Sequence, residues 1–162
     1  MRIKVRYANI NDCELILSFI KELAVYEKLE NEVVATVADL EVSLFHEKEA
    51  EVLLLEEDDQ AVGFALFFTN YSTFLGKGNI YLEDLYVKEE CRGRGYGKCL
   101  LAKLAEIALE RGCQRLDWAC LNWNTSSIEF YKSIQAKPLD EWTTFRMNTE
   151  AMENLVKNGQ KL

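Results

Sequence analysis

The sequence contains one proline and one histidine among its 162 residues, and it has no long hydrophobic run. No apolar stretch approaches the roughly 20 residues that span a bilayer, so we expect no membrane contact. The first eleven residues lack the apolar centre of a signal peptide. With His46 as the only histidine, a mechanism built on a Ser–His or Cys–His pair has a single candidate base, and no nucleophile lies near it in the sequence.

Clustered cysteines and clustered basic residues are also absent. The five cysteines are scattered and form no C-x-x-C pair, which predicts reduced thiols, no metal site and a cytoplasmic location. Basic residues number 19 and acidic residues 27, so the formal charge is 19 − 27 = −8. A chain this acidic is a poor partner for a phosphate backbone. We therefore expect no nucleic-acid binding and favour a small cationic ligand.

Short helical and strand patterns alternate along the whole chain without a repeat or a boundary. They predict one domain over residues 1–162, of mixed α/β class. The predicted strands are 2–7, 52–56, 61–69, 79–87, 115–121 and 142–148, and the predicted helices are 11–26, 36–46, 97–111, 125–134 and 150–157. The early hairpins favour antiparallel pairing, whereas the strand–helix–strand unit over 80–121 favours a parallel crossover.

A glycine-rich loop lies between a predicted strand and the predicted helix 97–111. It reads Arg92-Gly93-Arg94-Gly95-Tyr96-Gly97-Lys98. Helix N-termini bind anions, and glycines let the backbone approach a ligand closely. A Walker loop and a dinucleotide fingerprint both fail, because Arg92 and Lys98 stand where these motifs need glycine. R-x-x-G-x-G fits at Arg92, Gly95 and Gly97. On the residues alone, a plain glycine-rich turn remains the alternative.

This loop resembles the coenzyme A pyrophosphate motif of the GNAT superfamily of N-acetyltransferases. Residues 123–132, WNTSSIEFYK, resemble the superfamily's N-x-x-(S/A)-x-x-(F/L)-Y segment. Residues 20–29, 70–74 and 81–87 are similar to the spermidine/spermine (diamine) and thialysine acetyltransferases. The resemblance implies the GNAT fold, a central, mixed, mostly antiparallel sheet of six to seven strands, twisted and splayed, with helices on both faces. It also implies a homodimer.

The resemblance further implies acetyl-CoA as co-substrate and two sets of site residues. The coenzyme set is Leu85, Tyr86, Val87, Arg92, Gly93, Arg94, Gly95, Tyr96, Gly97, Lys98, Asn124, Ser127, Tyr131 and Lys132. The acceptor set is Tyr26, Glu27, Ser72, Glu83, Asp84 and Glu141. The family usually carries Gly-Ala where this chain has Gln135-Ala136, and we expect that change to alter the turn after the helix.

Acetyl transfer to an amine sets three chemical requirements. The attacking amine must be neutral, although a free alkylamine has a pKa near ~10. We interpret Glu83 as the group that accepts its proton through a water, with Asp84 as the second candidate; strand alternation sends Glu83 to the opposite face from Leu82 and Asp84. A backbone N–H near Tyr86 or Val87 would stabilise the oxyanion. Tyr131 is the candidate acid for the leaving thiolate.

Three hypotheses remain open at this point. The first is an acetyl-CoA-dependent N-acetyltransferase that acts directly on polyamines, diamines or lysine-like amino acids such as thialysine. The second is an acetyl-CoA-binding regulatory module without turnover, which the presence of both Glu83 and Tyr131 disfavours. The third is an acetyltransferase for protein lysines or N-termini, which ranks lower because 162 residues leave no extended peptide-docking insertion.

Overall fold

The computed structural model describes residues 1–159, which group into two compact units, Met1–Leu121 and the part that begins at Asn122. The first unit contains the whole sheet and the glycine-rich loop. The second contains two helices joined by an extended segment. A single domain over 1–162 remains a prediction.

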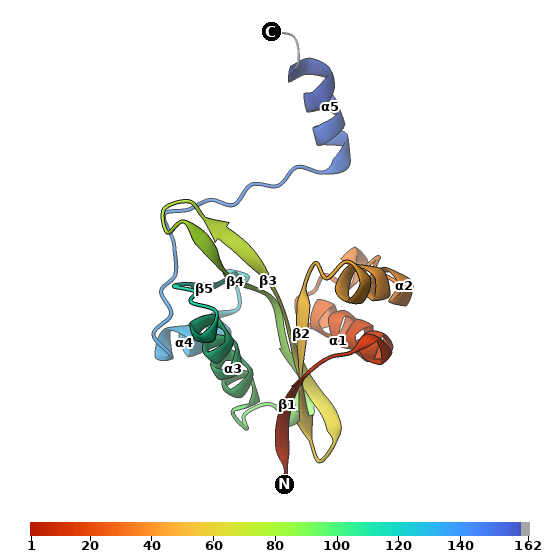
Figure 1. Cartoon of the computed structure of the whole chain (residues 1–162), viewed down its shortest axis with the longest axis vertical. Helices are drawn as coiled ribbons and strands as arrows, with labels where there is room; N and C mark the ends of the chain where they lie inside the picture. The colour runs from red at the N-terminus through yellow and green to blue at the C-terminus, as the bar shows by residue number, and fades with distance from the viewer. Residues whose placement is uncertain (160–162) are drawn as a thin grey trace. The chain divides into compact units, whose positions relative to one another are not determined.

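The sheet of the first unit has its strands in chain order (Figure 1). They are β1 (Ile3–Tyr7), β2 (Glu51–Glu57), β3 (Gln60–Ser72), β4 (Lys77–Val87) and β5 (Leu116–Trp118). The first four pair antiparallel, whereas β5 pairs parallel to β4. The mixed, mostly antiparallel sheet is therefore confirmed. Its size was overestimated, because residues 1–159 form five strands rather than six to seven.

The strand expected at 142–148 does not form, and β5 is shorter than the expected 115–121. A strand needs a neighbour for its backbone N–H and C=O groups. Residues 142–148 pair with no strand of the described chain, and β5 pairs with β4 over only three positions. The alternating sequence is compatible with a strand, but no strand of the described chain offers backbone hydrogen-bond partners to it.

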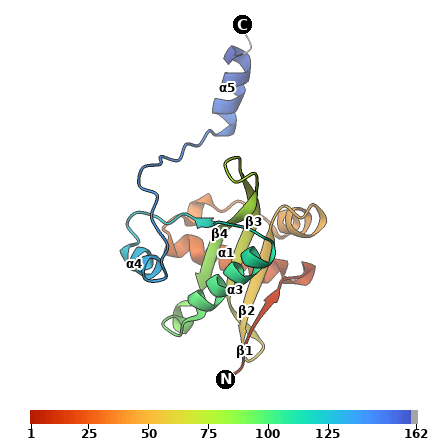
Figure 2. The same ribbon diagram turned by 60° about the vertical axis from the view of Figure 1, so that its left-hand side comes forward.

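Helices cover both faces of the sheet, as expected (Figures 1 and 2). On one face lie α1 (Cys13–Tyr26), α2 (Val37–Leu40) and the π-helical turn Glu41–His46; on the other lies α3 (Tyr96–Glu110). Short 3-10 turns occupy Ile10–Asp12, Glu30–Glu32 and Glu89–Cys91. The second unit contributes α4 (Thr125–Ser133) and α5 (Thr149–Gly159). No helix within residues 1–159 is long and apolar enough to span a membrane.

Local sequence signals explain where the first helices begin. The Thr36 hydroxyl accepts from the Asp39 N–H while the Asp39 carboxylate accepts from the Thr36 N–H, a capping box. The start of α1 differs from the prediction, because Asn9 and Asp12 form the capping box of the preceding 3-10 turn rather than Asn11 and Glu14. Asp12 is held there by Arg6, whose guanidinium donates to both of its carboxylate oxygens.

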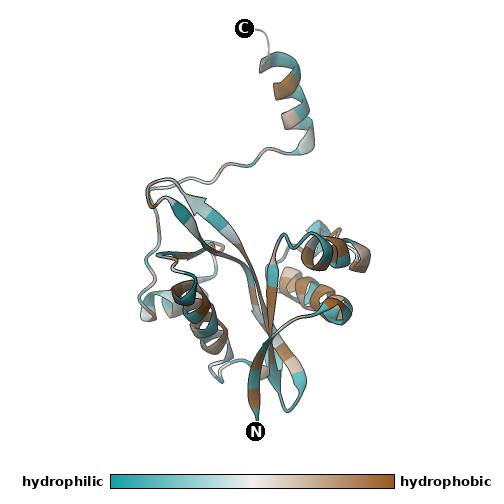
Figure 3. Cartoon of the chain, viewed as in Figure 1, coloured by the Kyte–Doolittle hydropathy of each residue, from teal (hydrophilic) through white to brown (hydrophobic). Residues whose placement is uncertain are grey.

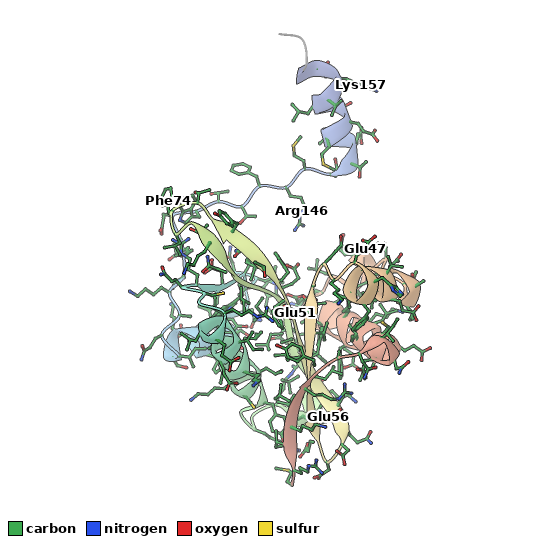
Figure 4. The ribbon with its side chains drawn as sticks, in the orientation of Figure 1. Glu47, Glu51, Glu56, Phe74, Arg146 and Lys157 are labelled. Carbon is green, nitrogen blue, oxygen red and sulfur yellow. The ribbon has the colours of Figure 1, made fainter. Side chains whose placement is uncertain are left out.

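The core lies on both faces of β2 and β3. Leu53, Leu54 and Leu55 follow one another in β2 and are 1%, 0% and 0% exposed. Three consecutive buried leucines require cover on both sides of the strand, and Figure 3 shows hydrophobic segments in the helices on either side. The tip of the β3–β4 hairpin is different, since Phe74 there is 95% exposed (Figure 4).

Candidate functional site

The centre of β4 contains a β-bulge at Glu83. Leu66 of β3 lies opposite Asp84, and the next residue of β3, Phe67, lies opposite Leu82. Glu83 is therefore the extra residue and has no partner across the ladder. A bulge interrupts the alternation of side chains and re-aims them. The expectation that Glu83 and Asp84 face opposite sides of the strand is wrong for this reason.

Both carboxylates instead line one pocket of about 380 Å³ between β4 and the end of α1. Glu27 and Glu32 line it as well, so four acidic residues surround it. As far as residues 1–159 define the lining, it contains no lysine or arginine. The remaining lining residues are Ile20, Leu23, Ala24, Leu29, Val33, Val34, Ala35. A pocket lined by apolar side chains and four acidic residues suits a short alkyl chain that carries positive charge.

Burial and mutual repulsion raise the pKa values of two of these acids. The pKa of Asp84 is raised to about 6, first by desolvation and then by the charges of Glu83 and Glu27. The pKa of Glu27 is also raised, by desolvation and by the charge of Glu83. A carboxyl group that titrates near neutral pH can accept and release a proton under physiological conditions.

The turn at the end of α1 places Glu27. Lys28 adopts the left-handed conformation with φ 60°, and the N–H groups of Lys28 and Leu29 donate to the carbonyls of Val25 and Ala24. This is a Schellman-type ending, here built without glycine. The segment that follows brings Glu32 to the pocket. Sequence reasoning missed Glu32, because a glutamate in a single short 3-10 turn carries no pattern that distinguishes it from a surface charge.

The glycine-rich loop has the backbone conformation that its sequence predicts. Gly93 and Gly95 have φ values of 77° and 83°, which disfavour any residue with a Cβ. Gly95 is the N-cap residue of α3, and no side chain at this position accepts a hydrogen bond from the first N–H groups of the helix. A Cβ built at Gly93, Gly95 or Gly97 would meet nothing within 4 Å. The first N–H groups of α3 therefore border open space, an arrangement that fits a diphosphate.

The loop's larger side chains contact the protein. Arg94 donates to both carboxylate oxygens of Glu57 at 3.0 and 3.1 Å. Arg92 donates from Nε to the Val87 carbonyl at 3.0 Å. Tyr96 is 5% exposed and packs into the core, whereas Lys98 is exposed. In this loop the backbone, rather than a cluster of free guanidinium groups, is what an anion would meet.

The second half of β4 diverges from β5. Parallel pairing joins Ile80, Tyr81 and Leu82 to residues 116–118 and extends no further in the described chain. Between Glu83 and Val87, every second backbone N–H group points away from β3, toward the side of β4 on which β5 no longer pairs. Tyr86 is 8% exposed and its hydroxyl donates to Glu22 at 2.8 Å. Burial and the hydrogen bond to Glu22 raise the pKa of Tyr86 to about 12, so the phenol keeps its proton at neutral pH.

The second unit carries the other predicted coenzyme residues on α4. The Asn124 side chain accepts from the Ser127 N–H at 3.4 Å and so caps the helix. Tyr131 is half-buried, with its ring 5.6 Å from that of Phe130. Lys132 forms an ion pair with Glu129 at 3.8 Å. Gln135 has φ 70°, so the turn after α4 contains a left-handed residue that is not glycine.

Two further predicted acceptor residues are, like Tyr26, absent from the pocket lining. Ser72 lies at the end of β3, opposite Lys77, six residues from Glu83 along β4, which is about 20 Å. Its hydroxyl accepts from Arg115 at 3.3 Å and from the Leu75 N–H at 3.2 Å. Glu141 is exposed in the second unit. Neither lines the acidic pocket, and their acceptor roles remain predictions.

Known proteins resemble the chain over nearly its whole length. A model of the acetyltransferase (GNAT) family matches residues 17–135. A thialysine N-epsilon-acetyltransferase from Bos taurus is 41% identical over 166 aligned positions, which cover 95% of this chain and 97% of that protein. A spermidine/spermine N(1)-acetyltransferase-like protein 1 from Homo sapiens is 34% identical over 94% of this chain and 24% of its own length.

A solved structure has the same fold. An integron cassette protein from the mobile metagenome of V. cholerae superposes with a TM-score of 0.80 at 30% identity. The match covers 98% of this chain and 99% of the cassette protein. The resemblance that the loop and the segment 123–132 indicated is therefore confirmed by the family model and by the identity to the acetyltransferases above.

Proposed function

The chain belongs to the GNAT acetyltransferase family, and we propose that it transfers the acetyl group of acetyl-CoA to a primary amine of a small cationic substrate. The amine attacks the thioester directly in a ternary complex. The proposed acceptors are polyamines, diamines and lysine-like amino acids such as thialysine. The thialysine N-epsilon-acetyltransferase from Bos taurus is 41% identical to the chain, and the spermidine/spermine N(1)-acetyltransferase-like protein 1 is 34% identical to it.

The acidic pocket is the observation that carries the choice of substrate. Glu27, Glu32, Glu83 and Asp84 surround a space of about 380 Å³ whose other lining residues are apolar. Four carboxylates that share so small a space repel one another, and a ligand with two positive charges would relieve that repulsion. A monoamine would relieve less of it. The pocket therefore favours an acceptor with a second cationic group.

The pair Glu83 and Asp84 supplies the proposed base. A protonated amine that enters the pocket must lose a proton before it can attack. Asp84, with its pKa raised to about 6, can take up that proton at neutral pH, either directly or through a water. Glu83, the bulge residue, lies beside it and completes the negative field that holds the cation. The sequence ranked Glu83 before Asp84 as the base. Because both residues line the pocket, their positions do not decide between them.

The coenzyme is proposed to lie along the glycine-rich loop and the diverging half of β4. The first N–H groups of α3 would hold the diphosphate, and free N–H groups of Leu85–Val87 would hold the pantetheine amide and the thioester carbonyl. On the family resemblance, Asn124, Ser127, Tyr131 and Lys132 are proposed as further coenzyme residues, with the Tyr131 hydroxyl as proton donor to the leaving thiolate. We also propose a homodimer, on the family resemblance, and a cytoplasmic location, on the scattered cysteines that form no C-x-x-C pair.

The test is release of free thiol from acetyl-CoA in the presence of a panel of amines. The panel contains 1,4-diaminobutane, spermidine, thialysine, lysine and butylamine as the singly charged match to the diamine. We expect kcat/KM for the best doubly charged acceptor to exceed that for butylamine by at least about tenfold, the effect of one further charge contact.

Two outcomes would contradict the proposal. No thiol release with any amine would indicate a coenzyme-binding module without turnover. Release that is absent with every amine of the panel and occurs when a lysine-containing peptide is supplied instead would indicate a protein acetyltransferase. Glu27→Gln provides a matched variant, because it removes one pocket charge and should lower the preference for diamine over butylamine without changing release with butylamine to the same degree.

A further inference from the structure

The Arg92 side chain connects the glycine-rich loop to the last turn of α1. Its guanidinium carbon lies 4.7 Å from the centre of the Tyr26 ring and 5.5 Å from the centre of the Tyr86 ring. Its Nε donates to the Val87 carbonyl at 3.0 Å. Three contacts thus hold the guanidinium against α1 and the end of β4.

The surface on which Arg92 rests is itself fixed. The Tyr86 ring lies 5.9 Å from the ring of Phe19, and its hydroxyl donates to Glu22 at 2.8 Å. Glu22 and Tyr26 are one helical turn apart, so both project from the same side of α1. Phe19, Glu22 and Tyr26 of α1 therefore meet Tyr86 and Arg92 along one continuous line of contacts.

This line of contacts ends at the acidic pocket. Tyr26 is the last residue of α1, and Glu27 directly after it lines the pocket together with Leu23 and Ala24 of the same turn. A shift of the last turn of α1 would move Glu27. From these contacts we infer that Arg92 is a positioning residue, which holds the acceptor wall against the coenzyme loop instead of binding phosphate through its side chain. The inference rests on the proposed function.

The chemistry of the loop supports this assignment. A planar guanidinium stacks on aromatic rings in a way that an ammonium group does not. The anion site at the start of α3 consists of backbone N–H groups and needs no guanidinium. Arg94, the other arginine of the loop, is likewise paired with protein, through Glu57. The side chains of both loop arginines therefore contact other parts of the protein and stabilise the conformation of the loop.

The test compares acceptor and coenzyme binding in Arg92→Gln. We expect the KM for 1,4-diaminobutane to rise about three- to tenfold, the range of a stacked cation contact, while kcat and the coenzyme A dissociation constant change less than about twofold. Removal of a positive charge near a cationic acceptor would by itself lower this KM. A rise therefore reports lost positioning. Arg2→Gln, the same substitution at the exposed start of the chain, is the charge-matched control.

Variants of Tyr26 separate positioning from a general loss of folding. Tyr26→Phe keeps the ring on which Arg92 stacks and should raise the KM less than Tyr26→Leu, which should reproduce the KM change of Arg92→Gln. The double variant Arg92→Gln/Tyr26→Leu should be no worse than either single one, because both remove the same contact. Arg92→Lys should recover only part of the effect.

Three results would overturn the inference. One is a tenfold or greater loss of coenzyme A affinity in Arg92→Gln with an unchanged acceptor KM, which would make Arg92 a phosphate ligand. Another is additivity in the double variant. The third is an acceptor KM that Arg92→Gln leaves unchanged while the unmodified chain releases thiol normally. Absence of thiol release in the unmodified chain would instead contradict the proposed function, so the two failures are distinguishable.

Discussion

Glu83 and Asp84 are neighbours in one strand, yet both line the same pocket. The cause is the bulge, which leaves Glu83 without a partner opposite and places Asp84 across from Leu66. In a regular strand the two carboxylates would lie on opposite faces. Their proximity concentrates negative charge at one point of β4, and the charge of Glu83 is one cause of the raised pKa of Asp84.

Asp84→Asn should stabilise the fold at neutral pH and impair catalysis. The pKa of Asp84 in the folded protein, about 6, lies above its ordinary value of 3.8. Ionisation therefore costs folding free energy, increasingly so as pH rises from 4 through 6. Removal of the charge should add roughly 2–3 kcal/mol above pH 7 and nothing near pH 3.5. The check is chemical unfolding of both proteins at the two pH values.

The same variant should lower kcat about 10²-fold or more if Asp84 accepts the proton. In the unmodified chain, kcat/KM should fall as pH drops below 6. Glu83→Gln is the matched comparison, since it removes the neighbouring charge and keeps Asp84. A full loss of activity in Glu83→Gln together with an active Asp84→Asn would assign the base to Glu83. An unchanged pH profile in both would leave the role to water.

Gly97→Ala should separate coenzyme binding from folding. Gly97 lies in the first turn of α3, its φ is not in the left-handed region, and a Cβ there meets nothing within 4 Å. Alanine should therefore preserve or slightly raise stability. A methyl group facing the diphosphate should nevertheless weaken coenzyme A binding about tenfold or more. Calorimetry and thermal unfolding measure the two effects.

Gly95→Ala is the contrasting variant for the same loop. Its φ of 83° makes alanine unfavourable by about 1–2 kcal/mol, so both stability and binding should fall. Gly97→Ala with undiminished coenzyme affinity would show that the coenzyme does not approach this part of the loop.

Tyr131→Phe should lower kcat by about 10²-fold, because it removes the proposed proton donor and keeps the ring. The dissociation constant of coenzyme A should change less than about twofold. Tyr71→Phe, at a position that is 68% exposed near the end of β3, is the control and should leave kcat unchanged. An unaltered kcat in Tyr131→Phe would remove the acid role from this residue.

Arg6→Met should destabilise the first unit without any direct effect on the site. Arg6 bridges Asp12 at 2.9 Å and Glu56 at 2.6 Å, and Glu56 is only 7% exposed. Loss of the guanidinium leaves a nearly buried carboxylate without its nearest cation, at a cost of about 2–4 kcal/mol. Denaturant unfolding at pH 7 measures this cost.

The pH dependence of that cost has a definite sign. The hydrogen bonds from Arg6 lower the pKa of Asp12 below its ordinary value of 3.8. A lowered carboxyl pKa contributes stability above pH 4 and loses it as pH falls through the folded-state value. The difference between the unmodified chain and Arg6→Met should therefore shrink below pH 4. A difference that stays constant down to pH 2.5 would show that Asp12 does not take part.

Local sequence signals determined most of the elements and the glycine-rich loop. The period of apolar residues in α1 and α3, the Thr36–Asp39 capping box and the glycines at 93 and 95 act over a few neighbouring residues. Their consequences follow from backbone sterics and helix periodicity, which the sequence displays directly. The parallel crossover from β4 through α3 to β5 follows from the order of those elements.

Tertiary structure alone decided the acidic pocket and the extent of the sheet. The bulge at Glu83 depends on how β3 aligns with β4, and the pocket needs Glu32 to return from a loop with no pattern of its own. The contact of Arg92 with Tyr26 joins residues 66 positions apart. Residues 142–148 have an alternating sequence that is compatible with a strand. A strand exists, however, only where a neighbouring strand completes its backbone hydrogen bonds. A short stretch of sequence does not determine whether such a neighbour is present.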